Sequence, residues 1–290
     1  MIDTLCILGV GLIGGSLARA LRAAGQVRRV VGCGRDRGNL DRALQLGVID
    51  DATADPAAAV AGADMVVVAV TLGATREILA RIAPALASHA LVTDVGSVKA
   101  SVLDAARETL GEAFPRFVAG HPIAGGEKSG VEASSATLYQ RHRVILTPHA
   151  EQAPDAVTRV AAMWHATGAA VDYLDAARHD EILAATSHLP HLLAYALVAS
   201  LLRLDGAESP FDYAAGGFRD FTRIASSNPA MWRDISLANA PALLAVCDRF
   251  EQVLGEFRQA IRMGDGATLE AGFGEAKAAR DDFLHRSSKA

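Results

Sequence analysis

Over residues 1–173, short apolar runs alternate with stretches in which apolar positions recur every three or four residues. Runs such as "MVVVAV" are apolar throughout, which is typical of strands covered on both faces of a parallel sheet. The stretches between them, such as "SLARALRAAG" and "KASVLDAARETL", have the period of amphipathic helices. The alternation predicts an α/β Rossmann-type domain, doubly wound around a mostly parallel sheet, over residues 1–173.

From about residue 175 the strand pattern disappears and helical periodicity continues to the end of the chain. We therefore expect an all-α domain over residues 174–290. Several of its helices are apolar over more than one face, which is more than their own core needs. A second copy of the chain would cover that surface, so the pattern predicts a homodimer through the helical domain.

The longest apolar run, "LLAYALVASLL" at residues 192–202, is too short to span a bilayer and predicts a buried helix. The chain enters its first core strand at once, without the pattern of a secretory signal. Cys6, Cys33 and Cys247 lack motif spacing and are expected to be buried free thiols. These features predict a cytoplasmic protein.

Charge excludes some classes of partner. The 28 Lys and Arg residues against 33 Asp and Glu residues give a net charge of −5, and no basic run with interleaved aromatic residues occurs. We therefore expect no nucleic-acid partner and no membrane partner. Local arginines remain available for a small anion.

The first chemical motif is the glycine turn of "LCILGVGLIGG" at residues 5–15, where a strand ends and a helix begins. A G-x-G-x-x-G in that position is typical of a dinucleotide-binding fold. Gly9 permits the tight turn, Gly11 lets a pyrophosphate approach the backbone, and Gly14 lets helix and strand pack closely. The predicted cofactor-binding residues of the turn are Gly9, Gly11, Leu12, Ile13 and Gly14.

The end of the second predicted strand, "RVVGCGRDRG" at residues 29–38, bears on the choice of cofactor. NAD-binding sites place an acid about 20 residues after the glycine turn, to bind the ribose 2′-hydroxyl. That count reaches Gly34, which leaves room for a 2′-phosphate that Arg35 could bind. The pattern favours NADP, but NAD stays open because Asp36 could bind the ribose while Arg35 is solvated.

Histidine is the side chain best suited to take a proton near neutral pH. His121 follows a short predicted strand and precedes Pro122 and a glycine turn, which predicts a rigid loop at the carboxyl ends of the strands, where ligands bind in such sheets. We expect it to be a general base. Ser97, between a strand and a helix, could bond a substrate hydroxyl or cap the helix. The neighbouring Lys99 is taken as a first-turn helix residue.

Arg223 in "FTRIA" is the candidate for binding a substrate carboxylate, because a guanidinium can grip it with two parallel hydrogen bonds. An ion pair with Asp220 is the alternative. His188 and His191, three residues apart, could ligate a metal, but no third ligand has zinc-like spacing. We expect no metal.

Four segments together carry a resemblance: "TDVGSVK", "GHPIAGGEKSG", "HDEILAATSHLPH" and "GGFRDFTRIASSNPAMWRDI". They are similar to the prephenate and arogenate dehydrogenases of tyrosine biosynthesis, over essentially the whole chain. The resemblance implies oxidative decarboxylation of prephenate, arogenate or both by a Rossmann domain joined to a helical dimerisation domain. It makes tyrosine a candidate inhibitor.

The resemblance also assigns residues. It makes His121 the catalytic histidine, assisted by Ser97, and Arg223 a substrate-binding residue. It implies that the "SHLPH" segment lines the substrate pocket and that two further residues lie near it. The substrate-binding residues are thus Arg223, Ser187, His188, His191, Glu127 and Trp232.

Two other functions remain open from the residues. One is a two-domain dehydrogenase acting on a 3-hydroxy acid, which commonly uses a lysine in its helical domain. The other is a dinucleotide-binding module without turnover, for which a base and a carboxylate-binding arginine would have no use. The sequence does not separate prephenate from arogenate.

Overall fold

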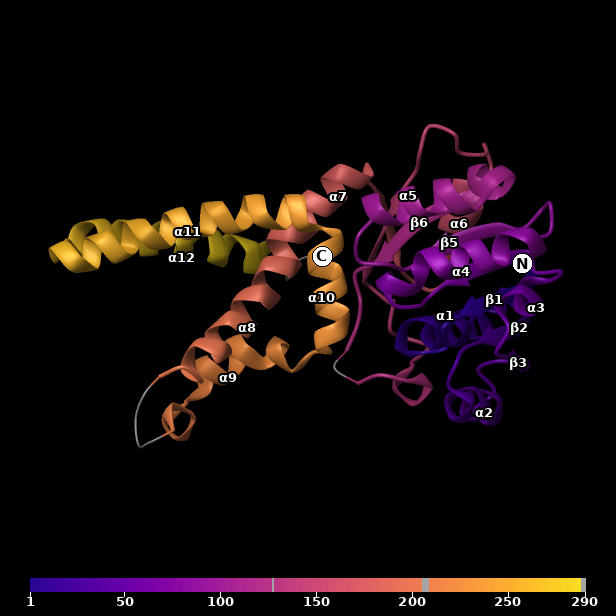
Figure 1. Ribbon diagram of the computed structural model, residues 1–290, viewed down its shortest axis with the longest axis horizontal. Helices are drawn as coiled ribbons and strands as arrows, with labels where there is room; N and C mark the ends of the chain where they lie inside the picture. The colour runs from indigo at the N-terminus through magenta and orange to yellow at the C-terminus, as the bar shows by residue number, and fades with distance from the viewer. Residues whose placement is uncertain (127, 205–208, 288–290) are drawn as a thin grey trace. The chain divides into compact units, whose positions relative to one another are not determined.

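The computed structural model describes residues 1–126, 128–204 and 209–287. Contacts between residues group the chain into two units, Met1–Ala240 and Pro241–Ala290, which we describe separately. The first unit holds the sheet and the helices up to α10, and the second holds α11 and α12 (Figure 1).

The sheet of the first unit has strand order β3-β2-β1-β4-β5-β6-β7-β8 in the described part of the chain. Its pairs are parallel except for β6 with β7. The strands are β1 (Ile2–Leu8), β2 (Val27–Cys33), β3 (Asp51–Thr53), β4 (Met65–Val68), β5 (Leu91–Asp94), β6 (Phe117–Pro122), β7 (Arg143–Thr147) and β8 (Ala170–Tyr173). The predicted doubly wound, mostly parallel sheet is confirmed.

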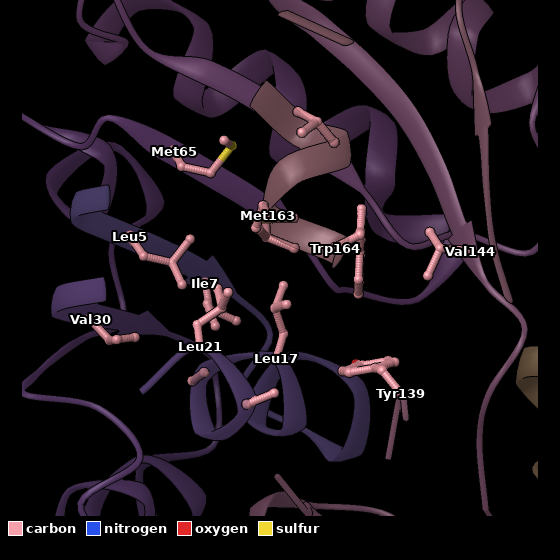
Figure 2. Close-up of a cluster of buried hydrophobic side chains, with 14 of the residues drawn as sticks. Leu5, Ile7, Leu17, Leu21, Val30, Met65, Tyr139, Val144, Met163 and Trp164 are labelled. Atoms are coloured by element: carbon pink, nitrogen blue, oxygen red, sulfur yellow. The ribbon is translucent and has the colours of Figure 1, made fainter. Parts of the chain in front are cut away.

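Helices cover both faces of the sheet, and strand alternation explains how. In β1, Leu5 and Ile7 belong to one buried cluster while Cys6 and Leu8 belong to the other. The first cluster packs against α1 (Leu12–Ala23), α2 (Arg37–Gln45) and α6 (Ala156–His165). Figure 2 shows its side chains, with Leu17 and Leu21 of α1 and Trp164 of α6 around the strands. The second packs against α3 (Pro56–Val60), α4 (Thr75–Ile82) and α5 (Ala100–Thr109).

After β8 the described chain is helical, as predicted. In the first unit, α7 (Ala176–Leu183), a π-helical turn η5 (Ala184–His188) and α8 (Leu189–Leu201) form one continuous helix (Figure 1). It is followed by α9 (Gly216–Thr222), a 3₁₀ turn η7 (Arg223–Ser226) and α10 (Pro229–Ala238). The helical sequence pattern continues beyond α10 without a break, whereas in the structure α10 ends at Ala238 and a new helix begins at Ala240.

That continuous helix corrects two predictions. Pro190 lies in the first turn of α8 and does not end the helix, so Ala176–Leu201 is 26 residues long. By length and composition alone, such a helix could cross a membrane. The run at 192–202 was expected to be buried, yet Leu192 and Leu197 are exposed in the single chain. His179, Asp180 and His188 of the same helix are buried by contacts within the protein.

The second unit is a hairpin of α11 (Ala240–Met263) and α12 (Gly266–Ser287). Phe257 and Phe273 meet across it with ring centroids 5.2 Å apart. A Cβ at Gly272 would lie 2.6 Å from the Phe257 ring, so a small residue lets the helices approach. Of the three free cysteines, Cys6 and Cys33 are buried as expected, but Cys247 on α11 is only half-buried.

The glycine turn after β1 has the conformation that its sequence predicts. Gly9 has φ +102°, and a Cβ there would lie 2.3 Å from the Ala69 carbonyl oxygen. A Cβ at Gly14 would lie 2.4 Å from the Gly9 carbonyl oxygen and 2.6 Å from Ile7 Cγ2. A Cβ at Gly11 would have no neighbouring atom within 4 Å, so the space beside this backbone position is open.

These contacts predict different stability costs for two alanine substitutions. Gly14→Ala should lower the free energy of unfolding by about 1–3 kcal/mol, because backbone has to move, and this outweighs a helix-propensity gain of at most about 1 kcal/mol. Gly11→Ala, the matched control, should cost less than about 1 kcal/mol, the worth of a glycine cap. Urea unfolding of both variants decides the point, and equal stability would contradict it.

Candidate functional site

His121 was expected in a loop, but it belongs to strand β6, near its carboxyl end, where it pairs with Ile145 of β7. Its neighbours come from three directions: the β5–α5 loop, the start of α7 and the π-helical turn. The carboxyl ends of parallel strands meet at one edge of a sheet, where doubly wound folds bind ligands. This edge also carries the glycine turn after β1.

A buried ion pair fixes the backbone just before His121. Lys99 is fully buried, and its Nζ donates to Asp94 Oδ2 at 2.5 Å and to the Gly120 carbonyl oxygen at 2.7 Å. Asp94 Oδ1 accepts from the Gly120 amide at 3.0 Å. Burial lowers the pKa of Lys99, and the Asp94 carboxylate opposes that shift. The pair therefore holds both polar groups of Gly120, and with them the end of β6.

A second buried carboxylate, Asp180 of α7, joins the helical segment to the nucleotide fold. Its Oδ1 accepts from the Lys99 amide at 2.7 Å and its Oδ2 from the Ala100 amide at 2.9 Å, at the start of α5. Oδ1 also bonds His179 Nδ1 at 2.7 Å. Burial alone would raise the pKa of Asp180, but hydrogen bonds from His179 and the two amides leave it lowered.

His179 contacts His121 directly. The distance from His179 Nε2 to His121 Nδ1 is 2.9 Å, and the rings meet edge to face. Burial lowers the pKa of His121 well below its usual range, and the charges of His179, Lys99 and His188 lower it further. His121 is therefore held neutral at neutral pH, which is the state that a proton acceptor needs.

Around His188 and Trp232 the site continues into the helical segment. His188 is buried, and Asn239 Nδ2 lies 3.0 Å from its Nδ1 while also donating to the Asp180 carbonyl oxygen at 2.8 Å. Burial lowers the pKa of His188 to about 4. Trp232 of α10 stacks on His191 with ring centroids 3.5 Å apart. His188 Nε2 and Trp232 Nε1 are buried without a hydrogen-bond partner among the described residues, so polar groups of a ligand could satisfy them.

Arg223, the first residue of η7, lies close enough to His191 for its charge to lower the pKa of that ring, although burial is the larger cause. His191 Nδ1 bonds the Ser187 carbonyl oxygen at 2.9 Å. The structure therefore brings together the predicted residues Arg223, His191, Ser187, His188 and Trp232. Glu127, also predicted, lies outside the described residues.

The predicted capping role of Ser97 is wrong. Helix α5 begins at Ala100, after Lys99, and its first amides are capped by Asp180 from a distant part of the chain. Ser97 is half-buried in the loop between β5 and α5, and no hydrogen bond joins it to His121 among the described residues. Its hydroxyl is left for another partner.

On the cofactor side, helix α1 begins without a side-chain cap at Gly11. Its first amides, which include those of Leu12 and Ile13, lack partners within the helix. By contrast Asp36 caps α2, its Oδ1 accepting from the Asn39 amide at 3.1 Å. Open space at Gly11 and uncapped amides fit a dinucleotide pyrophosphate.

At the end of β2, a Cβ on Gly34 would make only ordinary contact with Leu40, at 3.6 Å, and Arg35 is exposed. Asn39 also ties this region to the segment after the His121 loop, since its Oδ1 accepts from the Val131 amide at 2.9 Å. A hollow of about 310 Å³ lies between α2 and residues 129–132. Within the described ranges, no group of three possible metal ligands occurs.

Sequence reasoning missed the buried polar groups behind His121. Lys99 was set aside as a helix residue, and no role was assigned to Asp94, His179, Asp180 or Asn239. The sequence carries little signal for them, because His179 and Asp180 stand between Arg178 and Glu181 in α7, a run that is typical of an exposed helix face. The partner of Asp180 lies 80 residues away, at the start of α5, so the pattern could not name it.

Comparison with known proteins gives two family matches that together span most of the chain. The prephenate dehydrogenase nucleotide-binding domain matches residues 17–173, and the prephenate dehydrogenase dimerization domain matches residues 175–275. The cyclohexadienyl dehydrogenase of Zymomonas mobilis is 40% identical over 280 residues, which are 95% of this chain and 94% of that protein. The prephenate dehydrogenase of Bacillus subtilis is 36% identical over 292 residues, covering 100% of this chain and 78% of the relative.

A solved structure agrees with these matches. The crystal structure of prephenate dehydrogenase from A. aeolicus, in complex with hydroxyphenyl propionate and NAD+, superposes with a TM-score of 0.91 at 36% identity. The match covers 98% of this chain and 99% of that one.

The lowered pKa of His121 predicts the pH dependence of any reaction in which it accepts a proton. A base works only when deprotonated, so a lowered pKa moves the loss of activity to more acidic pH. We expect kcat/KM to stay constant as pH falls through 6.5 and to decline only below it. A pH profile measured with saturating cofactor checks this, and an acid limb centred at or above pH 6.5 would contradict it.

Proposed function

Because the chain belongs to the prephenate dehydrogenase family, we propose that it oxidatively decarboxylates prephenate, arogenate or both, with His121 as general base. The resemblance found in the sequence is thereby confirmed as to family. One observation carries the assignment of the base: the loop that follows His121 reaches the glycine turn, where a Cβ on Gly126 would lie 3.6 Å from Leu12 Cδ2. The neutral histidine and the dinucleotide turn thus share one edge of the sheet.

The chemistry of a cyclohexadienol assigns a role to each part of the site. A bound dinucleotide supplies the acceptor for the hydride of the carbinol carbon. His121 takes the hydroxyl proton. The ring carboxylate leaves as carbon dioxide, and the electron pair of its broken bond enters the ring, which becomes aromatic. The phenolate oxygen then takes the proton back from His121, which regenerates the base. Aromatisation drives the reaction, so the site has mainly to orient the carbinol hydrogen.

Ser97 is proposed to bond the substrate hydroxyl beside His121. Support comes from its place in the loop that ends at Lys99, since Lys99 holds the backbone next to His121. Because Ser97 does not cap α5, its hydroxyl is available to the substrate.

The substrate class carries two carboxylates, for which the helical segment offers a positive charge. We assign Arg223 to one of them, because its charge already acts on His191 within the same group of residues. His191, His188, Ser187 and Trp232 would line the rest of the pocket, where the unpartnered Trp232 Nε1 and His188 Nε2 can reach polar groups. Glu127 keeps its proposed place near the substrate on the resemblance alone.

A dehydrogenase that relies on a helical-domain lysine is disfavoured. In the described part of residues 174–290 the lysine is Lys277, which pairs with Asp281 on the exposed surface of α12. The buried Lys99 belongs to the nucleotide fold and is bound to Asp94.

We further propose NADP as the preferred cofactor. Gly34 leaves room at the end of β2, and Arg35 is exposed beside it. Asp36, the alternative ribose ligand, already caps α2. NAD remains the second candidate cofactor, and no metal is needed.

The helical residues 174–290 are the basis for the proposed oligomeric state. We propose a cytoplasmic homodimer in which residues 1–173 bind the dinucleotide and residues 174–290 bind substrate and the second copy. The match to a dimerization domain and the exposed Leu192 and Leu197 of α8 support it. Tyrosine, which resembles the product, is a candidate inhibitor.

Steady-state kinetics with prephenate and arogenate, each with NADP and NAD, test the reaction. We expect reduction of the nicotinamide, seen by absorbance, with at least one substrate. His121→Asn should lower kcat by about 10²–10⁴-fold, the usual worth of general-base catalysis, with little change in cofactor affinity. Turnover in none of the four combinations would overturn the proposed function, and normal turnover by the variant would overturn the role of His121.

Cofactor choice is tested at Gly34 and Arg35. Wild type should prefer NADP, and Gly34→Asp with Arg35→Ile should reverse the order, because a carboxylate repels the phosphate and the charge-assisted bonds are lost. Those bonds are worth about 1.5–3 kcal/mol, or one to two decades in affinity. Catalytic efficiency with each cofactor at saturating substrate is the measurement.

Arg37→Ile is the matched control, since it removes the same charge two residues away and should leave the preference nearly unchanged. Asp36→Ser keeps a good capping residue on α2 while removing the acid. A wild type that prefers NAD, with that preference lost in Asp36→Ser, would show that Asp36 binds the ribose and would refute the proposal.

A further inference from the structure

His179 uses both ring nitrogens inside the protein. It is fully buried, with Nδ1 2.7 Å from Asp180 Oδ1 and Nε2 2.9 Å from His121 Nδ1. The three residues therefore form an unbroken line from a carboxylate through one imidazole to the next. The far end of that line is Nε2 of His121, for which no hydrogen bond occurs within the described ranges.

The direction of the hydrogen bonds follows from the carboxylate. Asp180 accepts two backbone N–H bonds, from Lys99 and Ala100, which favour its ionised form. An ionised carboxylate can only accept, so His179 Nδ1 must carry a proton. A neutral His179 then has a lone pair on Nε2, and His121 must donate to it from Nδ1.

From this geometry we propose that His179, held by Asp180, is a positioning residue that keeps the proton of neutral His121 on Nδ1 and leaves its Nε2 free as the base. The proposal rests on the proposed function in naming His121 the base. The opposite direction would need a second proton on His179, which would place a buried positive charge beside His121 and near His188.

The same three residues also stabilise the positive charge that forms on His121 during the reaction. When His121 takes the substrate proton on Nε2, both its nitrogens carry protons, and Nδ1 still donates to His179. His179 in turn still donates to the Asp180 carboxylate, so the new positive charge faces a fixed anion through one neutral ring. No proton has to move along the line. A base held in one tautomer by a buried acceptor follows the logic of the serine-protease triad.

Asp180 is itself fixed from two sides, which gives the line its rigidity. The amides at the start of α5 hold its carboxylate, and Asn239 Nδ2 holds its carbonyl oxygen at 2.8 Å. The tautomer of His121 therefore depends on the docking of α7 against α5.

Two substitutions of His179 separate positioning from packing. Asn places an amide nitrogen where Nδ1 was, so the bond to Asp180 is kept and the acceptor for His121 is lost. Gln reaches the Nε2 position and can offer its amide oxygen to His121 Nδ1–H. Both variants replace the ring by an amide, so loss of the ring itself is common to the two.

We expect His179→Asn to lower kcat by about 10²–10⁴-fold, the loss seen when a catalytic histidine takes the wrong tautomer, while KM changes only a few-fold. His179→Gln should retain at least about tenfold more activity than His179→Asn. Equal losses in the two variants, accompanied by equal falls in thermal stability, would mean that His179 only fills space.

A readout independent of turnover is the ¹⁵N spectrum of the histidine side chains in the ¹⁵N-histidine-labelled full chain at pH 7.5, with the His121 signals assigned from His121→Asn. In wild type, His121 should show a protonated Nδ1 and an unprotonated Nε2, and in His179→Asn a protonated Nε2 should appear. A wild-type His121 protonated on Nε2 would overturn the proposal. This spectrum decides the tautomer even if the protein turns over no cyclohexadienol, so failure of the proposed function is distinguishable from failure of the inference.

Discussion

The carboxylate of Asp180 is the constraint on which the site depends. It binds the first amides of α5 and the ring of His179 at once, although the helix that carries it starts some 80 residues further along the chain. A carboxylate removed from water needs such partners, because burial without them costs several kcal/mol. The position of α7 is therefore set by the need to satisfy this charge, and the line from Asp180 to His121 follows from it.

The Lys99–Asp94 pair acts on the other side of His121. It binds both the amide and the carbonyl oxygen of Gly120, so the end of β6 has its polar groups satisfied by side chains as well as by neighbouring strands. Buried ion pairs add little net stability, but removing one partner leaves a costly unpaired charge. The arrangement is best understood as fixing one backbone position. It places His121, the proposed base, at the start of the loop whose Gly126 approaches Leu12 of the glycine turn.

The helix at the cofactor end of the fold begins without a side-chain cap. Aspartates cap α2, α3 and α7, and Asn228 caps α10, whereas α1 starts at Gly11 with no side-chain cap. Uncapped amides at a helix start attract anions through both hydrogen bonds and the helix dipole. Helices α4, α6 and α9 also begin without a side-chain cap, but among these starts the one of α1 adjoins the glycine turn, where a phosphate would bind.

Local patterns determined much of this protein from the sequence alone: the alternating strands and helices, the all-helical second part, the glycine turn, and the place of His121 at the carboxyl ends of the strands. Each rests on periodicity or on the conformational needs of glycine, which neighbouring residues fix. Only the tertiary structure decided that Lys99 is buried against Asp94, that Asp180 rather than Ser97 caps α5, and that His179 contacts His121. It also decided that α10 ends at Ala238, that His121 belongs to strand β6 and not to a loop, and that Pro190 continues a helix. These features depend on contacts between segments that are distant in sequence. A buried polar group needs a hydrogen-bond partner because leaving it unpaired is costly, and the local sequence pattern does not show which distant residue that partner is.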